Sequence, residues 1–270
     1  MTVPPTSHMT AASPPASGPI SYAATARVLM RLAWARTFTP MVLLGCIGLA
    51  LLPMVFALVF AARGSLSGDP VEFLVMRYDQ LVAGLATPLI ALLVGTSAFS
   101  AESDDGTLVY LVTTTTPRWW IVASRVTFAS LLTGCVSALA VWGTGAIAAN
   151  GSDPEHVTSA FTLAVFFGGA TYAALFTLLA LVTRRALVTG LVYVLFWEAT
   201  LSSTFPALHY LSVRYWMLSV AARFTDASGA TLDDGPSLGF SVAASIVLLL
   251  ATVVIGGRRL DRPRVTRLGT

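Results

Sequence analysis

Six stretches of this sequence are each long and apolar enough to cross a lipid bilayer as a helix. A helix rises 1.5 Å per residue, so about 20 apolar residues span a hydrocarbon core of about 30 Å. These stretches leave no room in the 270-residue chain for a sizeable water-soluble domain. The sequence therefore predicts an all-α integral membrane protein with six transmembrane helices, at residues 41–62, 80–99, 119–149, 158–182, 186–205 and 237–257.

The composition argues against a water-soluble protein, a P-loop ATPase and a nucleic-acid-binding protein. Only 11% of the residues are charged, against about a quarter in soluble proteins, so the polar side chains are too few to cover a water-facing surface. All 16 basic residues are arginine, and without a lysine the chain cannot bind ATP through a P-loop. The net charge of +3 is small, and the arginines follow the expected membrane topology, so we expect no nucleic-acid partner.

The N-terminal region divides into two parts. Residues 1–19 are rich in Pro, Ser, Thr and Ala and carry no charge, which is typical of a disordered tail. Residues 20–38 are predicted to form a helix with Arg27 and Arg31 on one face. This helix either lies along the lipid headgroups as an N-terminal interfacial helix or simply extends the first span. Residues 20–270 would together form one transmembrane domain in contact with lipid.

The distribution of arginine orients the predicted bundle. If the N-terminus is cytoplasmic, twelve arginines lie in cytoplasmic segments and only Arg63, Arg77, Arg214 and Arg223 lie outside. Short cytoplasmic loops of membrane proteins are enriched in basic residues. The sequence therefore predicts a multi-pass protein of the plasma (cell) membrane with both termini in the cytoplasm.

The outer segment 206–236 carries apolar residues at helical spacing, namely Leu208, Leu211, Tyr215 and Leu218. This pattern predicts a helix on the outer face, either interfacial or part of a re-entrant element.

The cytoplasmic segment between the second and third spans has an unusual pattern. Ser103 and Asp104 suit the N-terminus of a new helix, and Leu108, Leu111 and Val112 would share one face of it. Four consecutive threonines, residues 113–116, disfavour continuation of that helix. A membrane helix then restarts with Pro117 at its first position. A short cytoplasmic helix followed by a break is suited to docking a partner protein.

This segment resembles the ABC-2 permease family, in which the pattern E-x-x-x-G-T-L precedes Leu-rich residues, P-x-x-R and a further basic residue seven positions on. The matching residues are Glu102, Gly106, Thr107, Leu108, Leu111, Arg118 and Arg125. The family's proline position falls on Thr115, whereas this chain has its proline at Pro117. The six spans and the N-terminal interfacial helix also resemble the family.

The resemblance implies a function and a set of partners. The matching segment would be the coupling helix, which rests in a groove of a separate ABC ATPase subunit. The chain would be the permease subunit of a transporter, an exporter in most of the family, working with a second permease that is identical or homologous. ATP and Mg would bind the partner subunit, and the chain itself would bind no cofactor.

Other interpretations stay open at the level of sequence. The segment 102–125 can also be an ordinary solvated loop, with Arg125 extending to the interface. A polytopic membrane enzyme would need a catalytic or metal cluster, but His8, His156 and His209 lie in separate segments without ligand spacing. The sequence therefore suggests no catalytic or metal residues, and a scaffold or immunity protein without transport activity is a further alternative.

Two features within the predicted spans each have two possible interpretations. Glu198 is an acidic residue well inside a predicted span, where ionisable groups are costly and often functional. It is either a functional intramembrane residue or a protonated side chain hydrogen-bonded between helices. The small residues at 134 and 138, and at 164 and 168, permit close helix approach, either in a dimer or within one bundle.

Overall fold

The computed structural model describes residues 39–63, 69–104, 118–183, 185–227 and 235–261. Every regular element in these ranges is a helix, which confirms the predicted all-α class. Five helical stretches are long and apolar enough to cross a membrane, as expected of a membrane-embedded protein. The tail at 1–19 and the interfacial helix predicted at 20–38 lie outside the described residues.

The five long stretches match five of the predicted spans, with one extension. The second begins at Pro70 rather than at residue 80, because Pro70 occupies the first helical turn and the Asp69 side chain accepts a hydrogen bond from the Val71 amide at 3.0 Å. The stretches are α2 (Pro40–Arg63), the continuous α3 (Pro70–Arg77), η2 (Tyr78–Ala86) and α4 (Thr87–Asp104), α6 (Arg118–Ala148), η3 (Pro154–His156) with α7 (Val157–Val182), and α12 (Leu238–Asp261).

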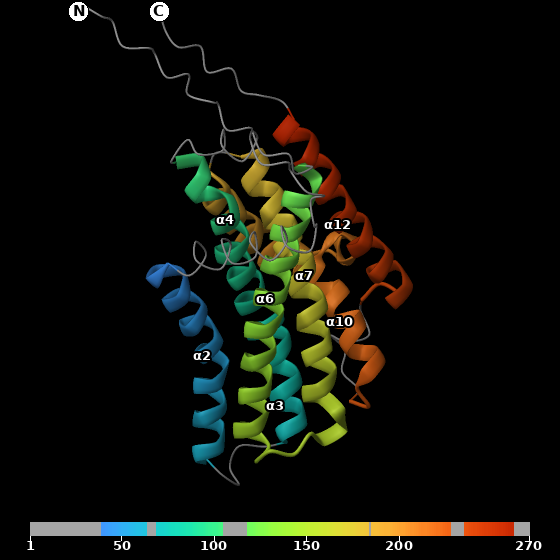
Figure 1. Ribbon diagram of the computed structural model, residues 1–270. Coiled ribbons are helices and arrows are strands. Elements are labelled where there is room, and N and C mark those ends of the chain that lie inside the picture. The colour runs from blue at the N-terminus through green and yellow to red at the C-terminus, as the bar shows by residue number, and fades with distance from the viewer. Residues whose placement is uncertain (1–38, 64–68, 105–117, 184, 228–234, 262–270) are drawn as a thin grey trace, which may run out of the picture.

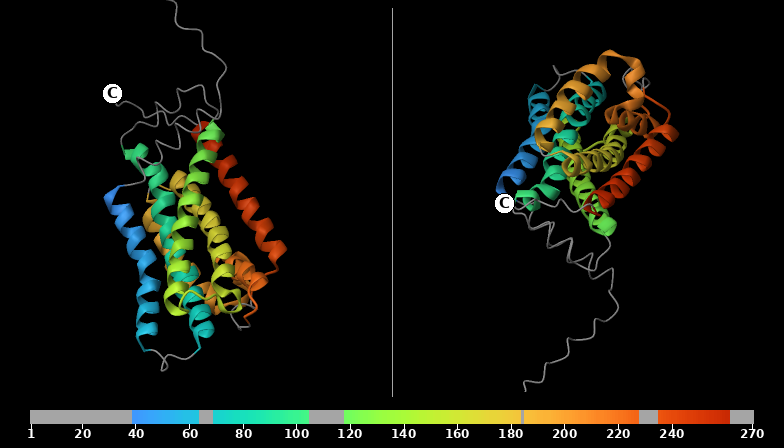
Figure 2. Two further views of the ribbon diagram at one scale, coloured as in Figure 1. Left: turned by 60° about the horizontal axis from the view of Figure 1, so that its bottom comes forward. Right: turned by 90° about the horizontal axis from the view of Figure 1, so that it is seen from above.

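Helix α7 forms the centre of the bundle. It packs against α4, α6 and α12, and against a further helix, α10 (Val213–Phe224). Helices α2 and α12 lie on opposite flanks (Figures 1 and 2). Only 17% of the most apolar part of each flanking helix is buried. Helices that are apolar and yet exposed are suited to contact with lipid.

Small residues bring α6 and α7 into close contact. A Cβ atom added to Gly169 would stand 3.3 Å from the backbone nitrogen of Gly134, and one added to Gly168 would overlap Met217 of α10. Ala164 is fully buried and Ala138 packs against the same core. The small residues noted in the sequence therefore serve packing within the chain, and they no longer argue for a dimer.

The stretch predicted as a fifth span is shorter than the five others. It runs without interruption through α8 (Ala186–Val192), η4 (Tyr193–Leu201) and α9 (Ser202–Thr204), and its apolar part, Ala186–Leu201, is not among the five long helices. A rise of 1.5 Å per residue gives it about 24 Å, short of a hydrocarbon core of about 30 Å. The helix ends at Phe205, which is extended because proline at 206 disfavours a helical conformation in the residue before it.

The helix predicted in the outer segment exists, but the predicted apolar face was wrong. A 3₁₀ helix, η5 (Pro206–Leu211), ends at Ser212, and α10 begins after it with a new register. Leu211 is consequently 60% exposed, whereas Leu218 of α10 is 1% exposed and packs in the core.

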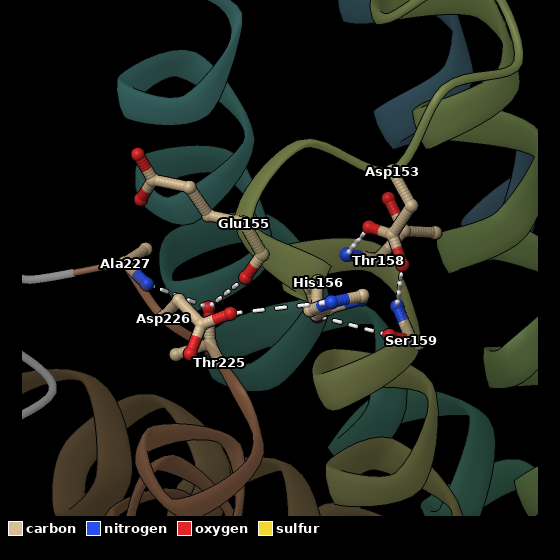
Figure 3. A network of polar contacts seen from close by, with 8 residues as sticks. All are labelled: Asp153, Glu155, His156, Thr158, Ser159, Thr225, Asp226 and Ala227. Carbon is tan, nitrogen blue, oxygen red and sulfur yellow. Dashed lines mark hydrogen bonds and ion pairs between the residues drawn. The ribbon is translucent and has the colours of Figure 1, made fainter.

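Polar contacts tie α10 to the end of the bundle where α7 begins (Figure 3). The Thr225 hydroxyl and the Asp226 amide donate to the Glu155 carbonyl at 2.9 and 3.0 Å. Next to them, the Asp153 carboxylate accepts from two amides in the first turn of α7, at 2.7 and 3.1 Å. At the opposite end of α7, Arg259 of α12 donates to the carbonyls of Leu181 and Val182 at 3.3 and 3.4 Å. The chain from Ala186 to Asp226 therefore runs from one end of α7 to the other.

Candidate functional site

The segment that resembles a coupling helix lies mostly outside the described residues. Gly106, Thr107, Leu108 and Leu111 belong to residues 105–117 and fall in this group. Glu102 is in the last turn of α4, which continues to Asp104. The sequence interpretation that Ser103 and Asp104 precede a new helix is therefore wrong in its boundary, because the apolar run of α4 carries the helix through them.

The two basic residues of the matching pattern both belong to α6. Arg118 is the first residue of the helix, and Arg125 follows it by seven positions, about two turns, on the same face. Arg125 is 7% exposed. It is thus buried in the bundle, whereas an arginine that extends to the interface would keep its guanidinium in solvent.

Glu198 is a fully buried acid with three hydrogen-bond donors around it. The Tyr193 hydroxyl and the Val213 amide donate to its Oε1 atom at 3.0 and 3.1 Å, and the Ser212 hydroxyl donates to Oε2. A buried polar group is tolerated when its hydrogen bonds are made. The acid found in the sequence is therefore satisfied by the chain itself.

Two of the donors to Glu198 lie at the start of helix α10. Ser212 and Val213 are the N-cap and the first residue of α10, whose first amides have no partner within the helix. The Ser212 side chain does not cap this helix, and the Glu198 carboxylate takes the Val213 amide in its place. Glu198 thus caps α10 from another part of the chain.

A second acid, Asp79, forms an ion pair with the next residue of α10, Arg214. The Arg214 guanidinium donates to Oδ1 of Asp79 from Nε at 3.0 Å and from Nη2 at 2.8 Å. Both side chains are largely buried, with 14% and 5% exposure. A Cβ at Gly84 would stand 3.3 Å from the Asp79 carbonyl oxygen, which is a tight contact, and 3.6 Å from the Arg214 guanidinium carbon, which is an ordinary one. Two acids from distant parts of the sequence therefore fix three consecutive residues at the start of α10.

Both acids lie in π-helical segments. Asp79 belongs to η2, where the Thr87 amide bonds the Val82 carbonyl, and Glu198 belongs to η4, where the Ser202 amide bonds the Trp197 carbonyl. Segments η2 and η4 contact each other. The proline after Thr87 lacks an amide hydrogen, which favours the change of register in η2. Segments of π-helix are rare and frequently occur at functional sites.

Tyr172 of α7 completes this group of side chains. It is fully buried beside Glu198. We call Asp79, Tyr172, Tyr193, Glu198, Ser212 and Arg214 the α10 anchor cluster. Its chemistry is that of a buried polar junction between helices, which fixes α10 while both acids keep their partners.

The sequence drew attention to Glu198 but not to the rest of this cluster. Asp79 stood one residue before the predicted second span, and Arg214 was assigned to the outer segment. Neither periodicity nor spacing connects positions 135 residues apart.

In the ranges that the structure describes, no three His, Cys, Asp or Glu side chains come together as metal ligands would. His156 and Asp226 are 4.0 Å apart in a well-exposed pair, and His209 is a separate, buried residue stacked on Tyr215. Comparison with models of known protein families and with curated proteins gives no match for this chain.

Proposed function

We propose that this chain is the membrane-spanning subunit of an ABC-2 type transporter, and that it couples ATP hydrolysis on a separate ATPase subunit to export of a substrate. The observation that carries the proposal is the E-x-x-x-G-T-L pattern, Glu102 to Leu108, in the sequence that joins two long apolar helices, α4 and α6. Helices α4 and α6 end and begin at the same end of the bundle (Figure 1). A segment held between two such helix ends can transmit movement into both.

The charge at this end of the bundle supports a cytoplasmic assignment. Arg118, Arg185, Arg258 and Arg259 lie at the ends of α6, α8 and α12 that face it. The sequence adds further arginines in the segments attached to the same end. Basic residues are retained on the cytoplasmic side of membrane proteins. The pattern at 102–125 would then face the compartment that contains ATP.

A sixth crossing is part of the proposal. Residues 186–226 pass from the C-terminal end of α7 to the Glu155 carbonyl before its N-terminal end, and α12 then returns to Leu181. The short helix that begins at Ala186, the η5 turn after it and α10 together cover the distance that a single long helix covers elsewhere in the bundle. Irregular backbone at membrane depth is tolerated where protein surrounds it, and the α10 anchor cluster supplies such surroundings.

In this proposal the ATPase is a separate subunit. Because the sequence contains no lysine, it has no P-loop of its own. The predicted apolar face of Leu108 and Leu111 would need a cover in the cytoplasm, and a partner ATPase supplies one. Mg and ATP belong to that partner, and a second permease subunit, identical or homologous, completes the proposed assembly.

Replacing Leu108 by Asp tests the proposal. A charge placed in a dry protein contact costs several kcal/mol when it is unpaired, on the order of 3 or more. We expect normal amounts of the variant in the membrane, loss of a copurifying ATPase that carries a Walker A motif, and loss of transport. Leu108→Met is the matched control, because it keeps the volume and the apolar character.

Retention of the ATPase and of transport by Leu108→Asp would refute the docking role. Repeated purification of the wild-type chain in mild detergent without an ATPase would instead favour a scaffold or a membrane enzyme.

A further inference from the structure

Arg77, at the edge between α2 and α3, forms no ion pair with any carboxylate in the described residues. Its guanidinium carbon lies 5.2 Å from the centre of the Phe56 ring and 5.5 Å from that of Phe73. The Nε atom is buried and has no hydrogen-bond partner among the residues that the structure describes. The same part of the chain offers no carboxylate within 4.0 Å of this guanidinium. Contacts with aromatic rings do not satisfy the N–H groups of a guanidinium, which can still donate hydrogen bonds.

The nearby acids are committed elsewhere or face away. Asp69 accepts the Val71 amide at the start of α3. Glu72 precedes Arg77 by five positions, and residues on a helix meet at three or four. Residues 64–68, which connect α2 to Asp69, contain no charged side chain. A counter-charge for Arg77 must therefore come from outside this neighbourhood.

The surface around Arg77 is apolar. Val55, Phe56, Val59 and Met76 have exposed fractions of 57%, 42%, 47% and 47%. In a membrane-embedded bundle these side chains face acyl chains, since α2 is largely unburied. Phe73 also stacks on Phe60 at 4.0 Å between ring centres, which holds one wall of the arginine site in place.

The position of Arg77 along its helix matches the headgroup region. The stretch Pro70–Ser97 has 28 residues, and at 1.5 Å per residue it rises about 42 Å, some 12 Å more than a hydrocarbon core. Arg77 stands about 10 Å from the start of this stretch by the same rise. Its side chain is thus at the boundary where lipid phosphates meet acyl chains.

We propose that Arg77, with the rings of Phe56 and Phe73, binds the phosphodiester group of a membrane phospholipid whose acyl chains lie on the apolar surface of α2 and α3. The guanidinium presents paired N–H donors in a plane that matches phosphate geometry. The aromatic faces stabilise the cation in a partly desolvated setting. This inference requires only that the protein is embedded in a membrane, and it is independent of the proposed ATPase.

Native mass spectrometry of the detergent-purified full-length chain tests the proposal. The probes are phosphatidylglycerol and a diacylglycerol with the same acyl chains but no phosphate. We expect the wild type to retain phosphatidylglycerol in preference, and Arg77→Gln to bind it on the order of tenfold more weakly, since one charge-assisted contact is lost. Arg77→Lys should recover part of the affinity, because it keeps the charge but not the planar fork.

The control is Arg223→Gln, which removes an exposed arginine from the last turn of α10. It should bind phosphatidylglycerol like the wild type. If Arg77→Gln binds phosphatidylglycerol as tightly as the wild type, the proposal is wrong. It is also wrong if the wild type retains phosphatidylglycerol and the diacylglycerol equally, and this second comparison does not depend on the folding of the variant. Displacement of the lipid by inorganic phosphate alone would also overturn the proposal. If Arg77→Gln no longer forms a dimer but binds phosphatidylglycerol unchanged, the counter-charge comes from a second copy of the chain and the lipid proposal is wrong.

Discussion

Glu198 shows how one acidic side chain can be kept inside an apolar bundle. Its carboxylate receives the Tyr193 hydroxyl, the Ser212 hydroxyl and the Val213 amide, and it is fully buried. Each of these groups would be costly to bury alone, and together they satisfy one another. The residue that looked most like a functional acid in the sequence therefore has a structural role as the cap of α10.

Glu198→Gln separates this capping role from a role in transport. The amide keeps the size of the side chain but loses the charge and presents an N–H₂ group to surrounding donors. We expect a loss of about 1–3 kcal/mol in stability, measured as a lower unfolding temperature in detergent. Ser212→Ala, which removes one donor and keeps the acid, should lose less.

An unfolding temperature of Glu198→Gln equal to that of the wild type would contradict the capping role. Unchanged transport and unchanged substrate-stimulated ATPase activity in this variant would show that Glu198 has no functional role beyond structure.

At the scale of elements, α10 is held by two carboxylates at its start and by a carbonyl at its end. Asp79 binds Arg214, and the Glu155 carbonyl receives Thr225 and Asp226. Breaking a buried ion pair by removing one partner costs about 3–5 kcal/mol, whereas replacing both partners by apolar residues can be neutral. The pair therefore fixes the position of α10 more than it adds to overall stability.

This asymmetry gives a prediction for three variants. Arg214→Met should lower the stability by about 3–5 kcal/mol, since it leaves the Asp79 carboxylate buried and unpaired. Asp79→Leu alone should also be destabilising, because Arg214 then lacks its partner. The double variant should be more stable than either single one, as judged by thermal unfolding in the same detergent. Additive losses in the double variant would show that the two side chains do not act as a pair.

The sequence predicted the long helices well because composition alone decides them. The residues of α2, α6, α7 and α12 form unbroken apolar runs, and each helix ends within a few residues of its run. The broken stretch from Ala186 to α10 was less predictable. Its π-helical register depends on contacts with η2, and the switch from η5 to α10 at Ser212 moved Leu211 off the face that carries Leu218.

Only part of the α10 anchor cluster could be predicted from the sequence. An acid in an apolar run is visible by itself, so Glu198 could be found. The partners of Asp79 and Glu198 come from positions 135 and 14 or 15 residues away, and they depend on where α10 folds back. Pairings set by tertiary structure have no periodic signal in a single sequence.

At the scale of the whole molecule, the described ends of the helices sort into two groups. Val182, Ala186 and the last turn of α12 lie at one end of the bundle, and Glu155 and Asp226 lie at the other. If the chain crosses the membrane six times, these two groups must face opposite compartments. Five crossings would put both ends of the segment 186–226 on one side.

Labelling of single cysteines with a membrane-impermeant maleimide distinguishes these arrangements. Cys46 and Cys135 are free thiols and would first be replaced by serine. New cysteines at Ser152 and Asp226 should react in intact cells, because both positions are exposed, Ser152 follows the end of α6, and Asp226 binds the Glu155 carbonyl before the start of α7. Cysteines at Arg185 and Arg258 should react only after the membrane is permeabilised, since positive charge is retained in the cytoplasm. Reaction of positions 185 and 226 from the same side would rule out a membrane crossing by residues 186–226. External labelling at 258 with protection at 152 would reverse the proposed orientation, and the E-x-x-x-G-T-L pattern would then face away from any cytoplasmic ATPase.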